Sequence, residues 1–581
     1  MYGRTIKEEL MMIRKMLKLL CSACFLLCGI MLHGQSVADI IDSYENINSN
    51  EKGDGDVENK ENKSPWPTFD ESKLKVESDK LSKILIDVKS TRQLSNDEDD
   101  LINLDLLELI IEDRIFNLEF KKHEMPLSAE GGFLTGIIYN ISGTRINSEE
   151  DGLKYLNKLK ALPAYFDERI ENLKAGQIRG VSSPKLIANI CLGMAKEISE
   201  SEADDNFFSK AVEGSSIEKK AIAGILTQVI PSYKKLVNYL ETDYIPNAPD
   251  AIGVSAINGG KEYYKQRVRY YATEDISPQE VFDIGMNEVN RIKEEMEGII
   301  SGLEFEGSFA DFCEFLRTDP QFYPKTGREL LHYAAWITKE MEGKLPDYFN
   351  KLPRMPLTVK PVPAALAANY TTGRYSGGSY KNKKAGQYWV NTTSLESRPL
   401  YVLPSLSLHE GVPGHHTQIM LAAELDLPKF RKSQYLSAFG EGWALYCEFL
   451  GKEAGMYHTE YEEFGALVYE MWRACRLVVD PGMHYLGWSR EKAFNFMKDN
   501  TALSIHEVGT EINRYIGWPG QAVSYKLGEL KIRKLRKFAE EKLGDKFDIR
   551  AFHDKVLENG SIPMATLDRI VKAWVKEVLL R

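Results

Sequence analysis

Apolar residues recur at helical spacing along most of the chain. In at least two segments they recur three or four residues apart, the spacing that places side chains on one face of an α-helix. These two sets are Leu81, Ile84, Leu85 and Val88, and Val289, Ile292, Met296 and Ile299. Residues 101–120 are also helical in pattern but more apolar, which indicates burial. The pattern predicts a mainly α-helical protein from about residue 78 onward.

The pattern changes between about residues 355 and 405. Prolines, a run rich in Gly and Tyr at 370–380, and the aromatic and β-branched residues of 387–391 follow one another here. Such residues bounded by Gly and Pro are typical of short strands and loops. We therefore expect one small β-sheet within a helical protein, and we divide the chain into an N-terminal helical region, 78–350, and a catalytic region, 351–581.

The N-terminus has the pattern of an export signal. Arg14, Lys15 and Lys18 precede an apolar run over residues 19–32, which is too short for a comfortable membrane span. We predict a signal peptide over 1–34, with a short membrane anchor as the alternative, and an exported protein of the periplasm or cell envelope, or one that is secreted. After signal cleavage no stable membrane span is expected. Residues 35–77 are polar with few large apolar side chains, which predicts a flexible leader.

Charge and cysteine content narrow the possible functions. The 581 residues carry a formal net charge of −11, and nucleic-acid binding requires a basic surface. We therefore expect no nucleic-acid partner. Beyond the signal, Cys191, Cys313, Cys447 and Cys475 are widely spaced and form no CxxC pair. They are expected to be buried apolar residues rather than a disulfide framework.

The segment 409–416, His-Glu-Gly-Val-Pro-Gly-His-His, carries the candidate metal chemistry. Hydrolytic zinc sites commonly take two His and one Glu as ligands and leave the fourth position for water. A Glu beside the first His then acts as general base on that water. We predict His409 as a ligand and Glu410 as the general base.

The second histidine departs from the usual HExxH spacing. On an ideal helix His415 lies about 120° around the axis from His409, whereas His416 shares its face but lies about 10.5 Å along the axis. Two imidazoles on one zinc ion have donor atoms only about 3 Å apart, so the helix must break. Pro413 and Gly414 are suited to break it. We expect His415 rather than His416 as the ligand, and His416 to point into the cleft or hold a carboxylate beside the site.

The third ligand is expected to be an acid on another helix. Residues 439–448 carry Glu441 and Glu448, seven positions apart on one helix face. Gly440 and Gly442 flank Glu441 and permit close backbone approach, so Glu441 is the expected ligand. A solvated helix-face carboxylate is the alternative, which the aromatic-rich surroundings disfavour. Glu448 is expected to accept the other N–H of a ligand imidazole.

Three segments together resemble the bacterial family called domain of unknown function 885. They are residues 409–418, 441–446 and 514–526, and the resemblance extends from about residue 75 to the C-terminus. That family is similar to a distant branch of the gluzincin metallopeptidases, in which a Glu ligand follows on a later helix. Glu441 follows His415 by 26 residues, in agreement with this order. The resemblance implies a large gluzincin-like helical fold with a deep cleft, a small sheet next to the metal site, and zinc at the cleft floor.

The same resemblance suggests donors for the oxyanion of a peptidase reaction. Relatives commonly use a Tyr or His from the C-terminal half, and Tyr525 is the first candidate here, with Tyr515 second. Asp480 is a candidate to orient a ligand histidine, and His484 a candidate to assist the oxyanion. Ordinary packing is the alternative role for all four residues.

Several further residues are candidates for substrate contacts. Arg514 and Lys526 are suited to a substrate carboxylate, with surface charge as the alternative, and Tyr515 lies in the same segment. Asn391 ends a predicted edge strand over 388–391, which is suited to hold an extended peptide by main-chain hydrogen bonds. The pair at 506–507 has no histidine four residues later, so we reject it as a second metal site.

These observations predict hydrolysis of peptide bonds in short peptides. A single Zn²⁺ ion held by His409, His415 and Glu441 would be the cofactor, and a peptide the substrate. Two alternatives stay open. One is zinc-dependent hydrolysis of non-peptide amides or esters, and the other is an exported peptide-binding protein without turnover.

Overall fold

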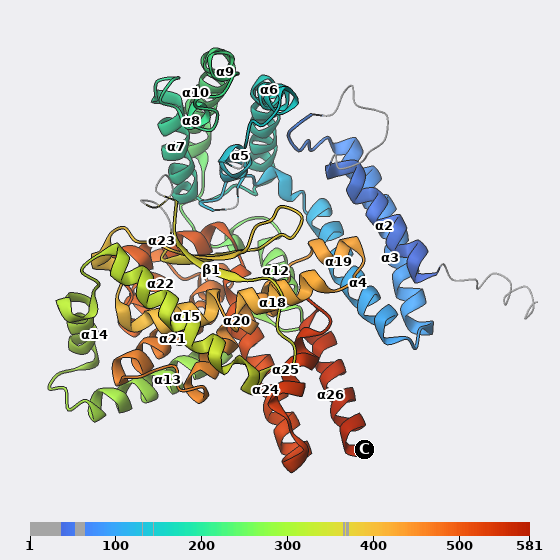
Figure 1. Cartoon of the computed structure of the whole chain (residues 1–581). Coiled ribbons are helices and arrows are strands. Elements are labelled where there is room, and N and C mark those ends of the chain that lie inside the picture. Colours follow the sequence, from blue (N-terminus) through green and yellow to red (C-terminus); the bar gives the residue numbers. More distant parts are fainter. Residues whose placement is uncertain (1–35, 53–63, 131, 143, 364–366, 368–370) are drawn as a thin grey trace, which may run out of the picture.

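Helices make up most of the protein in the computed structural model, which describes residues 36–52, 64–130, 132–142, 144–363, 367 and 371–581 (Figure 1). The predicted mainly helical class is confirmed. The α-helices are α2 (Val37–Lys52), α3 (Glu71–Leu94), α4 (Glu98–Glu119), α5 (Phe133–Ser142), α6 (Glu149–Arg179), α7 (Lys185–Glu200), α8 (Phe207–Lys210), α9 (Glu218–Gly224), α10 (Ile230–Tyr239), α11 (Ile245–Asn247), α12 (Gly260–Ala272), α13 (Pro278–Gly302), α14 (Phe309–Thr318), α15 (Gly327–Tyr348), α17 (Leu403–Glu410), α18 (His415–Glu424), α19 (Lys429–Ser433), α20 (Ser437–Glu453), α21 (Glu460–His484), α22 (Arg490–Asn500), α23 (Ile505–Gly517), α24 (Ser524–Leu543), α25 (Ile549–Leu557) and α26 (Met564–Leu580).

Local sequence explains where helices begin and which faces they bury. Ser277 and Glu280 form a capping box at the start of α13, with Pro278 in the first turn. The predicted apolar stripe of α13 is buried at Val289, Ile292 and Met296. On α3 the stripe is likewise buried at three of its four positions, Leu81, Ile84 and Val88. Both periodic segments therefore pack as their spacing predicts.

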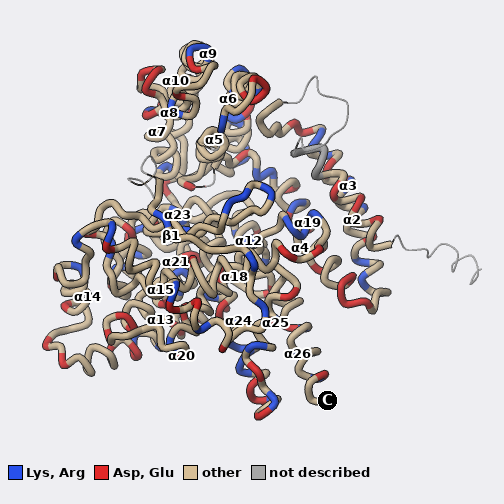
Figure 2. Tube along the Cα trace, viewed as in Figure 1, with Lys and Arg blue, Asp and Glu red and all other residues tan. Residues whose placement is uncertain are grey.

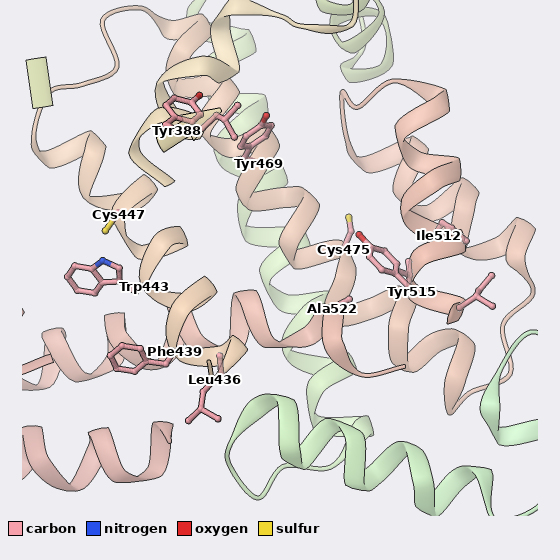
Figure 3. Packing of buried hydrophobic residues seen from close by; sticks show 14 of the residues in the cluster. Tyr388, Leu436, Phe439, Trp443, Cys447, Tyr469, Cys475, Ile512, Tyr515 and Ala522 are labelled. Carbon is pink, nitrogen blue, oxygen red and sulfur yellow. The ribbon is translucent and has the colours of Figure 1, made fainter. Parts of the chain in front are cut away.

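The helices that carry the predicted site pack together in the body of the molecule. Figure 1 shows α5 to α10 grouped at one end, with α2 and α3 side by side along one flank. Within the body, α13 packs along α21 and α20 packs along α24. One continuous hydrophobic core includes residues from Val37 to Val575. Phe439, Trp443 and Cys447 contribute to it from α20, as Figure 3 shows.

A three-stranded sheet lies beside the helices of the metal motif. It consists of β1 (Leu357–Pro361), β2 (Gly373–Ser376) and β3 (Gly386–Val390) in the order β1-β3-β2. Strand β3 pairs in parallel with β1 and antiparallel with β2, and β2 packs against α17. The expected small sheet is confirmed, but β3 is its central strand. The expectation of an edge strand over 388–391 is therefore wrong, and β2 and β1 form the edges.

The polar leader predicted over 35–77 is helical at both ends. Val37, Ile40 and Ile41 are buried along one face of α2, and α3 already begins at Glu71. The i, i+3, i+4 spacing of these apolar residues supplies a face that packs, despite the polar residues around them. The leader is thus corrected for 37–52 and 71–77, while residues 53–63 and the predicted signal at 1–34 lie outside the described residues. The division at residue 350 stays a prediction.

Charge and cysteine placement agree with the mixed composition. Figure 2 shows acidic and basic positions interspersed along the helices. Cys191, Cys313, Cys447 and Cys475 are buried and unpaired, as expected of apolar packing residues. Among the described residues, none of the helices combines the length and apolar character that a membrane crossing requires.

Candidate metal centre

The metal motif is divided between two helices. Helix α17 ends at Glu410 and α18 begins at His415, so the helix breaks at residues 411–414 as predicted. The Gly414 N–H donates to the carbonyl of Leu408, and the loop folds back against the end of α17. A Cβ atom on Gly414 would lie 2.1 Å from the His409 carbonyl oxygen, so only glycine fits this return. The break leaves the His409 and His415 rings with their centroids 4.8 Å apart.

Helix α20 brings Glu441 to the same two imidazoles. Its Oε2 lies 3.5 Å from Nε2 of His409 and 3.5 Å from Nε2 of His415. The three potential ligand atoms all lie within 4.8 Å of one another. Gly442 lets this helix approach α24 closely, because a Cβ there would lie 2.6 Å from the backbone of Gly528. The structure thus brings together the three residues that the sequence selected.

Glu448 contacts the far side of the first histidine. Its Oε1 lies 2.7 Å from Nδ1 of His409, and both side chains are about 4% exposed. Burial would lower the pKa of His409, but hydrogen bonds to Glu441 and Glu448 outweigh it and raise the pKa to about 9. The nearby His415 and His409 hold the pKa of Glu441 well below its usual range, against the effect of burial. The predicted role of Glu448 as partner of a ligand imidazole agrees with this geometry.

His416 faces the sheet instead. Its Nε2 donates to the carbonyl of Met355 at 2.9 Å, and Nδ1 lies 3.0 Å from the Tyr375 hydroxyl. Both ring nitrogens are therefore engaged, and burial lowers the pKa of this histidine. His416 is neither beside the three ligand atoms nor bonded to a carboxylate, so the expectation that it holds a carboxylate or points into a cleft is wrong. It fixes α18 against β2.

Glu410 lies next to the cluster and is held by the edge strand of the sheet. The Tyr375 backbone N–H donates to its Oε2 at 2.7 Å, and the side chain remains half-buried. Tyr375 therefore links the predicted general base to His416 through one residue. Sequence reasoning missed Tyr375, because only the packing of β2 against α17 brings this N–H to Glu410.

Two tyrosines lie beside Glu441. The Tyr435 hydroxyl donates to Oε1 of Glu441 at 2.9 Å, and this side chain is 44% exposed. Tyr525 begins α24, is half-buried, and lies close enough to Glu441 that burial and this carboxylate raise its pKa. Tyr525 was predicted to be near the site. Tyr435 was missed, because its position before α20 follows no spacing rule.

Asp480 and His484 have structural partners away from the ligand histidines. Asp480 accepts hydrogen bonds from the Tyr264 hydroxyl at 2.6 Å and the Gly520 N–H at 3.0 Å. His484 is fully buried, accepts from the Val254 N–H through Nδ1, and donates to a main-chain carbonyl through Nε2. The predicted roles in orienting a ligand and assisting the oxyanion are therefore wrong. Both residues join α21 to distant segments.

Three predicted substrate contacts are also structural. Tyr515 is fully buried and its hydroxyl accepts from Trp472 and Arg476. Lys526 is fully buried among acids, with Glu470 at 2.6 Å, Glu529 at 2.8 Å and Glu288 at 3.2 Å. Asn391 is fully buried, and its amide donates to the carbonyls of Ala367 and Thr371. Partners within the protein engage each of these polar groups, so their role is structural. Arg514 is paired with Glu511 and Gln521 but keeps some exposure.

The fold and the site define a mainly helical protein with a His-His-Glu cluster, His409, His415 and Glu441, beside a second acid, Glu410. The chain belongs to the family described as Bacterial protein of unknown function (DUF885), whose sequence profile matches residues 53–571. A crystal structure described as a "putative lipoprotein" from Colwellia psychrerythraea is similar, with 27% identity and a TM-score of 0.85 over 94% of this chain and 99% of that one. A solved structure from Shewanella oneidensis, described as a "putative lipoprotein of unknown function", shares the fold at 16% identity, with a TM-score of 0.74 over 92% of this chain and 100% of that one. No curated protein matches the chain.

Proposed function

We propose that this protein hydrolyses peptide bonds in short peptides with one Zn²⁺ ion held by His409, His415 and Glu441. The observation that carries the proposal is the convergence of two imidazole nitrogens and one carboxylate oxygen next to Glu410. This donor set is the one that hydrolytic zinc sites commonly use. The gluzincin-like relationship and the deep cleft belong to the same proposal.

The donor atoms fit a zinc ion in type, and the separations of Glu441 from both histidines fit it in spacing. Bond lengths of about 2.0 to 2.1 Å in a tetrahedral site place neighbouring ligand atoms about 3.3 Å apart. The 3.5 Å separations of Glu441 Oε2 from both imidazoles are close to that value. The Glu448 carboxylate accepts the Nδ1–H of His409, so a bound ion would displace the proton of Nε2 and take its lone pair. Zn²⁺ in such a site supplies a Lewis acid that polarises a carbonyl and lowers the pKa of water.

Three residues around the proposed zinc site would have distinct roles in the reaction. Glu410, oriented by the Tyr375 N–H, would take the proton of the attacking water and pass it to the leaving amine. The Tyr525 hydroxyl would donate to the oxyanion that develops on the substrate carbonyl. Tyr435 donates to Oε1 of Glu441 and so directs Oε2 toward the imidazoles.

The sheet edge and the exposure of the site support a peptide substrate. Strand β2 lies at the edge of the sheet next to Glu410, where an extended peptide can add main-chain hydrogen bonds. Solvent reaches the site, because the Glu441 side chain is 15% exposed and Tyr435 is 44% exposed. The basic and apolar N-terminal segment and the similarity to proteins described as "putative lipoproteins" support export to the cell envelope.

The test is a peptidase assay on the purified chain with its zinc content measured. Glu410→Gln removes the proposed base, so hydrolysis of mixed peptides should fall by a factor of about 10² to 10⁴ while bound zinc is unchanged. Glu424→Gln is the matched control, because this glutamate lies on α18 and pairs with Arg354 away from the cluster. It should keep full activity.

The outcomes separate the proposal from its alternatives. Full peptide hydrolysis in Glu410→Gln would rule out the proposed mechanism. Hydrolysis of amides or esters without peptide hydrolysis would indicate that the substrates are non-peptide amides or esters. Bound zinc with tight peptide binding and no turnover would indicate a binding protein.

A further inference from the structure

Four arginines gather beside the metal centre around two glutamates. We call Arg398, Arg473, Arg476 and Arg514 the arginine cluster. Arg473 and Arg476 lie on α21, Arg514 lies on α23, and Arg398 follows the 3₁₀ turn Leu395–Ser397. Glu507 and Glu511, also on α23, lie within electrostatic reach of these guanidinium groups. Neither glutamate was expected to have a role.

The arginine cluster has hydrogen-bonding capacity that the protein itself leaves unused. Within the part of the chain that the structure describes, Nε of Arg398, Nε of Arg473 and Nη1 of Arg476 are buried without a hydrogen-bond partner. Arg473 and Arg476 are only 4% and 3% exposed. A buried charged donor without an acceptor costs more than a neutral one. All three arginines lie within electrostatic reach of Glu507, so a single anionic acceptor bound among them would find donors that the protein leaves open.

The stacking of Arg476 holds its guanidinium in one plane. Its Cζ lies 4.4 Å from the ring centroid of Trp472 and 4.2 Å from that of Tyr525. Nε donates to the Tyr515 hydroxyl, and Nη2 pairs with Glu511 at 3.2 Å. Only Nη1 is left, and the stacked group cannot turn to satisfy it elsewhere. A planar guanidinium held in this way is suited to a carboxylate.

The arginine cluster also carries more positive than negative charge, which likewise favours an anionic ligand. Glu511 pairs with Arg514 and Arg476, and Glu448 lies 3.5 Å from Arg473 but is shared with His409. Burial and the neighbouring Glu511 raise the pKa of Glu507 to about 7, so this carboxyl is partly protonated at neutral pH. Among the described residues, the ion pairs of the four arginines involve two carboxylates, those of Glu448 and Glu511. Net positive charge is left in a buried site.

Two residues connect the arginine cluster to the proposed metal ligands. Tyr525, which stacks on Arg476, lies near Glu441. On the other side, Arg473 contacts Glu448, which holds His409. Tyr525 and Glu448 therefore each contact both the arginine cluster and a residue of the candidate metal centre.

From these contacts we infer that the arginine cluster, with Arg476 at its centre, binds a carboxylate of the substrate. The inference rests on the proposed peptidase function and narrows it to short peptides with a free carboxylate near the scissile bond. The carboxylate is either the C-terminus or an acidic side chain. Both present the same planar, bidentate acceptor to a guanidinium.

Equilibrium binding of three peptides tests the inference without requiring turnover. The probes are N-acetyl-trialanine as the free acid, the same peptide as the C-terminal amide, and an amide whose last residue is glutamate. Each is titrated calorimetrically into the full chain carrying Glu410→Gln and supplied with zinc. The free acid should bind at least about tenfold more tightly than the plain amide, the size expected for one charge-assisted hydrogen bond. The glutamate amide shows whether a side-chain carboxylate serves as well as a C-terminus.

Two substitutions assign the preference to Arg476. In Arg476→Gln the acid and the amide should bind with nearly equal affinity. Arg476→Lys keeps the buried charge but loses the planar fork, so the preference should fall by several-fold without vanishing. The matched control is Arg291→Gln, which removes an arginine that pairs with Glu288 and Glu295 on α13 and should keep the full preference. Thermal unfolding shows whether each variant is folded.

The inference is overturned if the protein with an intact arginine cluster binds the free acid and the amide with equal affinity. This result needs no arginine variant. It is also overturned if a folded Arg476→Gln protein keeps the acid preference. These outcomes are distinct from failure of the proposed function. Equal hydrolysis of the free acid and the amide would support the proposed peptidase function and contradict the carboxylate-binding site. A preference for the free acid that depends on Arg476, found without any hydrolysis, would support the carboxylate-binding site and contradict the proposed peptidase function.

Discussion

His409 and Glu448 form a buried hydrogen bond with 2.7 Å between Nδ1 and Oε1. Glu448 follows Glu441 by seven residues on α20, so two helical turns bring both acids to the same histidine. Glu441 faces Nε2 and Glu448 faces Nδ1. One helix therefore carries one proposed ligand, Glu441, and also orients another proposed ligand, His409.

Replacing Glu448 should weaken metal binding without removing a ligand. Glu448→Gln retains the shape of the side chain but loses the charge that makes His409 a stronger donor. Substitutions of this kind typically lower metal affinity by about 10- to 100-fold. Competition with a chromogenic chelator measures the zinc affinity. Glu453→Gln, on the same helix and paired with Arg536 away from the cluster, should not change it. Equal affinities in both variants would refute the role of Glu448.

His415 and His416 should separate cleanly when each is replaced by alanine. His415→Ala removes one of the three converging donors, so the protein should lose stoichiometric zinc. His416→Ala removes hydrogen bonds to Met355 and Tyr375 but no ligand. It should keep zinc and lose about 2 kcal/mol or more of stability, because it leaves buried polar groups unpaired.

Zinc content and thermal midpoints of the two alanine variants decide the assignment. The reverse result, with zinc lost from His416→Ala and kept by His415→Ala, would exchange the roles of the two histidines. A folded His415→Ala protein with one full equivalent of zinc would exclude His415 as a ligand.

The sequence predicted the residues of the metal cluster more completely than it predicted the residues around them. The spacing of His409 and His415 required a break at Pro413 and Gly414, and α17 and α18 are separated there. The glycines beside Glu441 indicated close packing, and Gly442 does lie against α24. These features are local or follow from the geometry of one ion. Helical periodicity predicted the fold class for the same reason.

Residues whose roles depend on distant partners could not be predicted. Lys526 resembles a substrate-binding cation in sequence, yet its nearest acids include Glu288, far away on α13. His484 is bonded to the backbone of Val254, and Asn391 is bonded to a neighbouring loop. A buried ionic network and an active-site charge have the same residue types. Only tertiary packing distinguishes the two.

The two tyrosines beside Glu441 should affect different steps. Tyr525→Phe removes the proposed oxyanion donor, so kcat should fall by about 10² to 10³ with little change in KM or zinc content. Tyr435→Phe removes the hydrogen bond to Glu441 and should instead weaken zinc binding, by about tenfold. Steady-state kinetics and chelator competition on both variants measure the two effects. A Tyr525→Phe enzyme with unchanged kcat would exclude that hydroxyl as the donor.

Glu507 should make the protein less stable as the pH rises. Burial and the neighbouring Glu511 raise the pKa of Glu507 from 4.5 to about 7, and the cluster arginines offset this only in part. Between these two pH values the unfolded chain releases the proton while the folded protein retains it. The free energy of unfolding therefore falls as pH rises through this window, by up to about 3 kcal/mol above pH 7.

Glu507→Gln removes this penalty because its side chain is always neutral. The variant should unfold at nearly the same temperature as the unsubstituted protein near pH 4.5 and at a higher temperature at pH 8. The difference should grow steadily between these values, as thermal unfolding at half-unit pH intervals can measure. Glu491→Gln, an exposed acid on α22, is the control and should show no such growth. A Glu507→Gln protein that is less stable at pH 8 would mean that the ionised carboxylate is needed to balance the arginines. In that case Glu507 would be a charge partner of the arginine cluster rather than a partly protonated acid.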